Sequence, residues 1–202
     1  MNTIQKGQER KEQILLSLEK YGFLSTSQLQ KIHNLGSYRN ACRVLANMKE
    51  YVNIKRLSEN VFYLNRKGHE LIGSEKKTFH ANMQIEHIIM RNELIIYLQP
   101  KKYQIEQPLI DSQGNILIRP DALFLFDKWM FIEIDNIQKM IINKRKIEKY
   151  AEINNSKMLH NSLGYFPKLI FLTKSEKRKE RLIKLCSERN ICHNIYLLEE
   201  IK

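Results

Sequence analysis

Acidic residues inside strongly apolar segments are the feature that most constrains this chain. Residues 116–126 and 129–134 are rich in β-branched and aromatic side chains, which predicts two consecutive β-strands. Asp121 lies in the first segment, while Glu133 and Asp135 occupy alternate positions of the second and should point to one face of a sheet. A buried carboxylate is costly without a compensating cation. We therefore expect a metal ion or basic side chains beside these acids.

The segments around this pair of strands predict alternating helices and strands. Apolar periodicity indicates helices over residues 85–98 and 138–153 and another from Ser175, and apolar runs predict strands over 103–109, 168–173 and 191–198. The order is helix, three strands, helix, strand, helix, strand, which favours a mixed sheet flanked by helices. The helix over 138–153 carries a basic cluster: Lys144, Arg145, Lys146 and Lys149. In the helix from Ser175, we expect Ile183 to face inward and Arg178 to face outward.

The N-terminal part predicts three short helices followed by a hairpin. A helix over 8–21 ends at Gly22, and Ser25 followed by Gln28 predicts a capping box that opens the second helix. The third helix begins near Ser37, after a turn. Two β-prone runs separated by a three-residue loop then predict the hairpin: 52–57 and 61–64.

The exposed side of the third helix has the residue types that contact DNA. Its inward positions should be Ala41, Val44, Leu45 and Met48, which leaves Tyr38, Arg39, Asn40 and Arg43 toward the opposite surface. Arginine contacts guanine or phosphate, asparagine contacts adenine, and tyrosine reaches the sugar-phosphate backbone. Two further cations on the hairpin would contact flanking phosphates: Lys55 and Arg56.

Composition supports a polyanionic partner. The 202 residues have a formal net charge of +12, of which residues 1–79 carry +7 and residues 80–202 carry +5. The three cysteines have no CxxC spacing, so we expect reduced thiols, with neither disulfides nor a zinc site. No apolar run is long enough for a membrane span, and the N-terminus lacks the apolar core of a signal peptide, so we expect a cytoplasmic protein without a membrane partner. Phosphate-binding loops of nucleotide hydrolases are missing.

Three resemblances follow from these residues. Pro120-Asp121 and Glu133-Ile134-Asp135 resemble the metal-site motif of the PD-(D/E)XK nuclease-like fold, except that Asp135 stands where that family has lysine. The three helices and hairpin resemble a winged helix-turn-helix. Together they resemble the replication-relaxation family of plasmid and mobile-element proteins, as does His80-Ala81-Asn82. The resemblance implies an α+β chain: a winged helix-turn-helix over residues 1–73 and a restriction-endonuclease-like α/β domain over 80–202.

The nuclease resemblance implies candidate site residues and leaves two interpretations open. The candidate catalytic residues are Asp121, Glu133, Asp135, Lys146 and Lys149, where either lysine would replace the missing one. The candidate ligands for Mg²⁺ or Mn²⁺ are Glu86, Asp121 and Glu133. In the second interpretation the acids form salt bridges with Arg119, Lys146 and Lys149, and the domain does not cleave DNA. We favour the second because Asp135 departs from the catalytic pattern.

The sequence therefore predicts a sequence-specific binder of double-stranded DNA, and the resemblance implies that it acts in plasmid or mobile-element replication, relaxation or mobilisation. The resemblance implies a homodimer on DNA, with a relaxase or replication protein as a further partner. Two alternatives stay open: a metal-dependent DNA endonuclease, and a transcriptional repressor with a C-terminal dimerisation domain.

Overall fold

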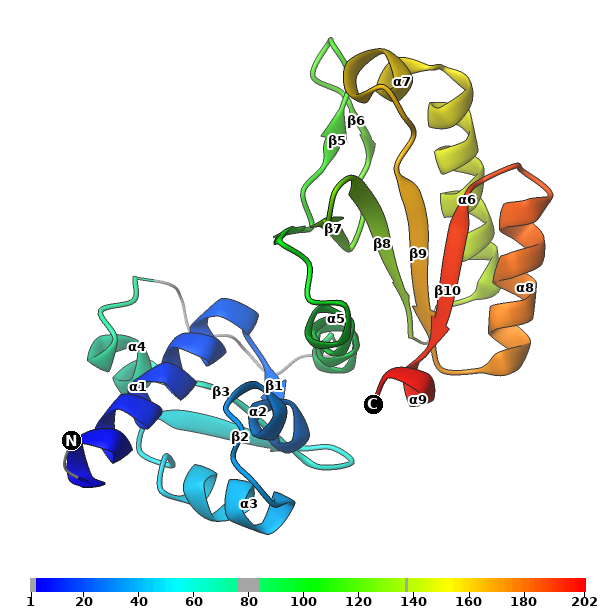
Figure 1. The fold of residues 1–202 in the computed structure, drawn as a ribbon. Helices are drawn as coiled ribbons and strands as arrows, with labels where there is room; N and C mark the ends of the chain where they lie inside the picture. Colours follow the sequence, from blue (N-terminus) through cyan, green and yellow to red (C-terminus); the bar gives the residue numbers. More distant parts are fainter. Residues whose placement is uncertain (1–2, 76–83, 137) are drawn as a thin grey trace. The chain divides into compact units, whose positions relative to one another are not determined.

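The computed structural model describes residues 3–75, 84–136 and 138–202, and it divides into two compact units. The first unit is Met1–Asn92 and the second is Glu93–Lys202. The helix α5 (Ile85–Leu98) begins in the first unit and ends in the second. Figure 1 shows helices and strands in both units, so the chain is of mixed α+β class, as predicted. His80-Ala81-Asn82 lies outside the described residues.

Three helices open the first unit: α1 (Thr3–Tyr21), α2 (Thr26–Ile32) and α3 (Tyr38–Ala46). The predicted capping box is confirmed, because Ser25 Oγ accepts the N–H of Gln28 while the Gln28 side chain accepts the N–H of Ser25. Such an N-cap contributes about 1 kcal/mol to helix stability. Ser37 caps α3 in the same way by accepting the N–H of Asn40.

A three-stranded antiparallel sheet with the order β1-β3-β2 completes the core of this unit. Its strands are β1 (Leu24–Ser25), β2 (Val52–Arg56) and β3 (Asn60–Leu64), so the predicted hairpin is confirmed. The inner face of the hairpin presents Val52 and Phe62 to a core that also contains Leu45 and Met48 of the α3 segment. This shared core fixes α3 against the hairpin.

The start of α5 packs on the first unit. Gln28 donates a side-chain hydrogen bond to the carbonyl of Ile89 at 2.8 Å. The wholly buried Asn92 donates to the carbonyls of Tyr21 and Phe23, at 3.1 and 2.8 Å. The compact units therefore divide at a later point than the 73–80 segment in which the composition changes. The short helix α4 (Arg66–Leu71) lies between β3 and that segment.

A five-stranded mixed sheet with the order β10-β9-β8-β7-β4 forms the second unit. β4 (Lys102–Ile105), β7 (Ala122–Leu125) and β8 (Trp129–Asp135) are antiparallel neighbours, while β9 (Lys168–Thr173) and β10 (His193–Leu197) run parallel to β8. The parallel connections pass through α6 (Met140–Asn155) and α8 (Glu176–Ser187), which cover one face of the sheet in Figure 1. The short helices α7 (Met158–Leu163) and α9 (Leu198–Ile201) were not predicted.

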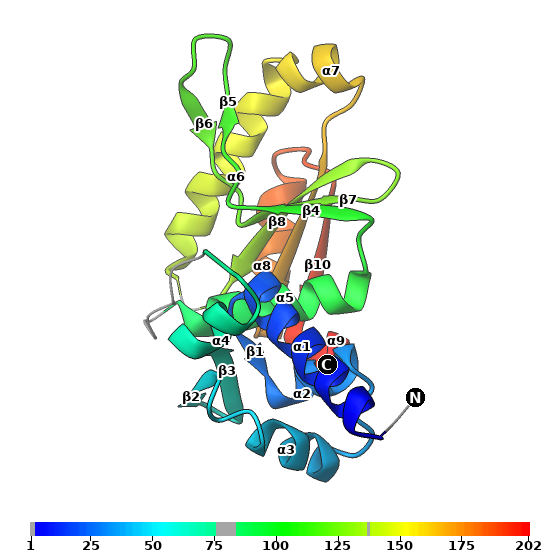
Figure 2. The same cartoon turned by 90° about the vertical axis from the view of Figure 1, so that its left-hand side faces the viewer.

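The prediction of one strand over 116–126 is wrong, because this segment forms two separate strands. β6 (Ile116–Ile118) pairs with β5 (Leu109–Ile110), and Figure 2 shows this hairpin projecting beyond the main sheet. The chain re-enters the main sheet only at β7. Pro120 lies at the break, where its ring removes the backbone N–H that a continuous ladder would need. Asp121 therefore lies immediately before β7 and not within a long strand.

The core of the second unit lies between the sheet and its two covering helices. Phe131 and Phe171 from the sheet pack with Ile147 and Tyr150 of α6 and with Leu182 of α8. On α8 the predicted inward position of Ile183 is wrong, because that side chain is exposed and the apolar Cys186 is buried instead. Within the described residues, none of the helices combines the length and the apolar character needed to cross a bilayer.

Candidate functional site

The strand register places Asp121 and Glu133 opposite each other. Ala122 pairs with Ile132 across the antiparallel β7–β8 ladder, so the next position along the ladder pairs Asp121 with Glu133. Residues opposite each other on neighbouring strands share a face. The face is the one covered by α6, because Lys146 of that helix contacts both acids. The predicted convergence of these two carboxylates is therefore present in the structure.

Each oxygen of the wholly buried Glu133 has a hydrogen-bond donor. Lys146 Nζ donates to Oε2, and the Tyr150 hydroxyl donates to Oε1 at 2.7 Å. Asp121 accepts the backbone N–H of Ile134 at 2.6 Å and lies 3.7 Å from Lys146 Nζ. The ammonium group thus lies between two carboxylates, at the position where a cation that bridges them would sit.

This cluster contains two carboxyl groups and one ammonium group, so it lacks one positive charge. Burial, and then repulsion from Asp121, raise the pKa of Glu133 to about 8, although Lys146 opposes both effects. Burial by itself would lower the pKa of Lys146, but attraction to Glu133 and Asp121 raises it overall. Burial next to Glu133 also raises the pKa of Tyr150. The cluster therefore favours uptake of a proton or of additional positive charge.

Asp135 belongs to a different network, although it follows Glu133 by two positions. Arg178 of α8 contacts both of its carboxylate oxygens, with Nε at 2.6 Å from Oδ2. Asn143 and Thr173 donate to the same carboxylate at 2.7 and 2.8 Å. Asp135 is wholly buried, so this forked contact compensates its charge. The sequence placed Arg178 on a solvated helix face, and its role was missed because the partner is 43 residues away.

Two basic candidates of the second unit do not pair with Asp121 or Glu133. Lys149 pairs with Glu152 at 3.0 Å on the exposed side of α6, and Arg119 is exposed. The expected salt bridges of these two side chains to the buried acids are therefore absent from the described interactions, so that of the three expected cations Lys146 alone pairs with Asp121 and Glu133. Glu86 is an exposed residue in the first turn of α5, in the first unit.

A divalent ion does not fit this cluster as it is arranged. Among residues 3–75, 84–136 and 138–202, no three His, Cys, Asp or Glu side chains form a group that could hold a metal ion. An ion that bound both Asp121 and Glu133 would have to displace the ammonium group of Lys146. The arrangement is that of an internal ion-pair cluster, in which the lysine serves as the cation.

The second candidate surface is the solvent side of α3 in the first unit. Tyr38 keeps 45% of its surface exposed, and Arg39 and Arg43 are also exposed. The opposite side of the helix buries Ala41 and Leu45, as the periodicity predicts. These three polar side chains therefore project from a helix whose other face is anchored in the core.

Asn40 has a different environment from its three neighbours. Its side-chain amide donates to the carbonyl of Leu35 at 2.7 Å, and its side-chain oxygen accepts from Arg43 at 2.8 Å. Asn40 therefore closes the turn before α3 and orients Arg43. A direct contact from Asn40 to a base would break both bonds, so its geometry suits positioning better than base contact.

Strand alternation separates the two predicted cations of the hairpin. Ile54 pairs with Phe62, whose side chain packs in the core beneath α3, so Ile54 and Arg56 lie on the α3 side. Lys55 pairs with Val61, which packs with Phe23 and Ile85 on the other side. The face shared with α3 therefore presents Arg56 and Ile54, which is 41% exposed. Sequence analysis missed Ile54, although its alternation with Lys55 could have indicated it.

The cations of α3 and of the hairpin are not paired with acids. In the described part of the chain, the hydrogen-bond partners of Arg43 and Arg56 are the neutral side chains of Asn40 and Asn60, and no ion pair involves Arg39 or Lys55. The positive charge of exposed cations without acidic partners is not cancelled locally, so these side chains can attract a polyanion.

Comparison with known proteins identifies the class to which this two-unit chain belongs. The family model described as replication-relaxation matches residues 15–169, which is more than half of the chain and includes parts of both units. The chain belongs to the replication-relaxation family. No curated protein and no solved structure matches it.

Proposed function

We propose that this protein binds specific sites on double-stranded DNA through its first unit, in keeping with the role in replication or relaxation that its family indicates. The observation that carries the proposal is the unpaired basic surface made by α3 and the hairpin, centred on Arg39, Arg43 and Arg56. The order of the elements, α1-β1-α2-α3-β2-β3, supports a winged helix-turn-helix. In that arrangement α3 enters the major groove and the hairpin is the wing.

The residues of this surface have distinct roles in the proposed complex. Arg39 and Arg43 contact base edges or phosphates from α3, Tyr38 contacts the sugar-phosphate backbone, and Asn40 holds Arg43 in place. Arg56 and Ile54 contact the DNA beside α3, and Lys55 contributes mainly long-range attraction. We further propose that two copies bind one site, as helix-turn-helix dimers do, with a relaxase or replication protein as a further partner.

The experiment is selection of bound sequences from random DNA, followed by fluorescence anisotropy on the selected site. Arg39→Ala and Arg43→Ala should each weaken specific binding by about 1–3 kcal/mol. Lys67→Ala is a matched control, because Lys67 is an exposed cation of the same unit that pairs with Glu50. If both arginine variants bind like the wild type, the assignment of α3 is wrong.

For the second unit we propose a nuclease-like domain of the PD-(D/E)XK type that does not cleave DNA. The order α5-β4-β7-β8-α6-β9-α8-β10, with β5–β6 inserted, supports this assignment, as do the acids at the facing ends of β7 and β8. The loss of cleavage is supported by two contacts of buried acids: Lys146 occupies the space between Asp121 and Glu133, and Arg178 holds Asp135 away from that cluster.

A metal-dependent endonuclease is the second candidate, because Asp121, Glu133 and Lys146 share one site. Incubation of the protein with supercoiled and branched DNA in Mg²⁺ or Mn²⁺ distinguishes the two. We expect no cleavage above that of the Asp121→Asn variant. Cleavage by the wild type that Asp121→Asn abolishes would establish the enzyme instead.

The DNA that the protein binds in cells distinguishes a transcriptional repressor from these two candidate functions. Recovery and sequencing of bound DNA should give a replication origin or transfer site. Recovery of the protein's own promoter alone would support the repressor.

A further inference from the structure

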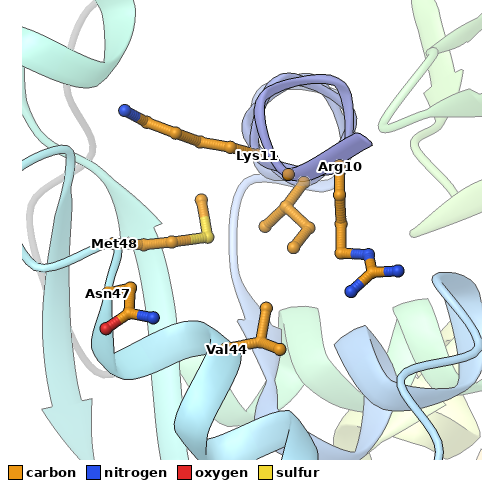
Figure 3. Close-up of a pocket in the computed structure, with 7 residues that line it drawn as sticks. Arg10, Lys11, Val44, Asn47 and Met48 are labelled. Carbon is orange, nitrogen blue, oxygen red and sulfur yellow. The ribbon is translucent and has the colours of Figure 1, made fainter. Parts of the chain in front are cut away.

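A hollow of about 240 Å³ lies within the first unit, between the N-terminal half of α1 and the C-terminal end of α3 (Figure 3). One wall is formed by α1 residues with the spacing i, i+3, i+4 and i+7, which places them on one helix face: Gly7, Arg10, Lys11 and Ile14. The other wall is formed by Val44, Asn47 and Met48. The volume is slightly below the roughly 300–1,000 Å³ of common small-molecule sites, so it suits a small ligand.

The floor of the hollow is apolar and belongs to the rigid core. Ile14 and Met48 are buried and pack in the main hydrophobic cluster of the unit, with Val44 packed against it. In Figure 3 the side chains of Val44 and Met48 point toward α1. An apolar body that entered the hollow would therefore meet a preformed hydrophobic surface.

Gly7 keeps one side of the hollow open. Glycine is a poor helix former, yet it occurs inside α1, where a Cβ atom would meet nothing within 4 Å. Packing therefore does not require glycine at this position. A larger side chain at position 7 would instead project from the helix face that lines the hollow.

Arg10 supplies the charge of the site. Its guanidinium group lies beside the hollow in Figure 3, and none of the lining residues is acidic. In the described part of the chain no ion pair involves Arg10. Lys11 extends away from the hollow and places its ammonium group over the ring of Tyr51, 3.7 Å from the centroid. Asn47 adds a neutral polar group to the opposite wall.

We propose that this hollow binds a small organic carboxylate with an apolar body. The apolar part lies on Ile14, Val44 and Met48, and the carboxylate pairs with the guanidinium group of Arg10, whose planar fork matches a carboxylate. The site is separate from the proposed DNA contacts, and its test requires no DNA.

The experiment is methyl NMR of the full-length protein titrated with 4-phenylbutanoate, whose ring should shift nearby methyl signals. We expect saturable shifts of Ile14 and Met48, while Met158 in the second unit stays unchanged. The neutral analogue 4-phenyl-1-butanol should bind roughly tenfold more weakly, because it lacks the charge that pairs with Arg10. Equal affinity for acid and alcohol would overturn the proposal.

Three variants define the site. Arg10→Gln should remove the preference for the acid, and Gly7→Leu should weaken the binding of both compounds. Gly7→Ala is the matched control, since it adds only one methyl group and should retain binding. Arg10 is exposed, so its variant keeps the test valid even if Gly7→Leu fails to fold. Shifts that Arg10→Gln leaves unaltered, or no saturable shift at Ile14 and Met48, would refute the site.

Discussion

The first unit carries Arg39, Arg43 and Arg56 at its surface without acidic partners, whereas the second unit holds Glu133 and Asp135 wholly buried, each bound by a basic side chain. An exposed, unpaired cation contributes little to folding but attracts a polyanion over a long range. Removal of one member of a buried ion pair strongly destabilises the folded protein, because the other charge is left buried without a partner. Substitutions of these charged residues should therefore affect DNA binding in the first unit and stability in the second.

Removal of Lys146 should produce the largest effect. Lys146→Met leaves Asp121 and the buried Glu133 without a cation, and should lower the free energy of unfolding by about 3–5 kcal/mol in urea denaturation. Lys149→Met is the matched control on the same helix, and it should cost less than about 1 kcal/mol because its pair with Glu152 is exposed. Equal losses of stability for the two variants would show that the buried cluster does not depend on Lys146.

The pH dependence of stability should reveal the same cluster. The folded state raises the pKa of Glu133 from 4.5 to about 8, so it binds that proton more tightly than the unfolded chain does. The stability from this group is fully present below about pH 4.5 and is lost as the pH rises through 8. The slope is at most about 1.4 kcal/mol per pH unit.

Glu133→Gln isolates this contribution, because it removes the titrating group and keeps its shape. Urea denaturation from pH 5 to 8 should show a steeper decline for the wild type than for the variant. Parallel curves would show that Glu133 is ionised throughout this range.

Arg178→Lys should have a smaller but clear effect on stability. Lysine keeps the charge and loses the forked contact with Asp135, which should cost about 2–3 kcal/mol. Arg181→Lys is the control, because Arg181 is exposed on the same helix and its replacement should be nearly neutral. Folded Arg178→Lys protein should bind specific DNA as tightly as the wild type, because Arg178 stabilises the second unit and the proposed DNA contacts lie in the first.

The smallest expected effect is the difference in DNA affinity between variants of the two hairpin cations. Arg56 lies on the face shared with α3, so Arg56→Ala should weaken specific DNA binding by about 1–2 kcal/mol. Lys55→Ala should weaken it by less than about 0.5 kcal/mol, since Lys55 points to the opposite face. Anisotropy titrations at one salt concentration measure both. A larger loss for Lys55→Ala would reverse the proposed orientation of the hairpin.

Local features of the sequence were sufficient to predict much of this fold. The capping box at Ser25 and the inward side of α3 follow from interactions within one or two helical turns, and the hairpin follows from strand propensity and loop length. Strand alternation likewise predicted that Glu133 and Asp135 share a face, because alternation along a strand is a local property, whereas the meeting of Asp121 with Glu133 was implied only by the resemblance to the nuclease motif.

What the tertiary structure alone decided is which charged groups meet. It selected Lys146 for Glu133 from three candidate cations, and it brought Arg178 to Asp135. The sequence determined that buried acids would need cations, because desolvation of a carboxylate is costly in any fold. The identity of each partner depends on how helices pack on the sheet, and contacts between residues far apart in the chain leave no local pattern in the sequence.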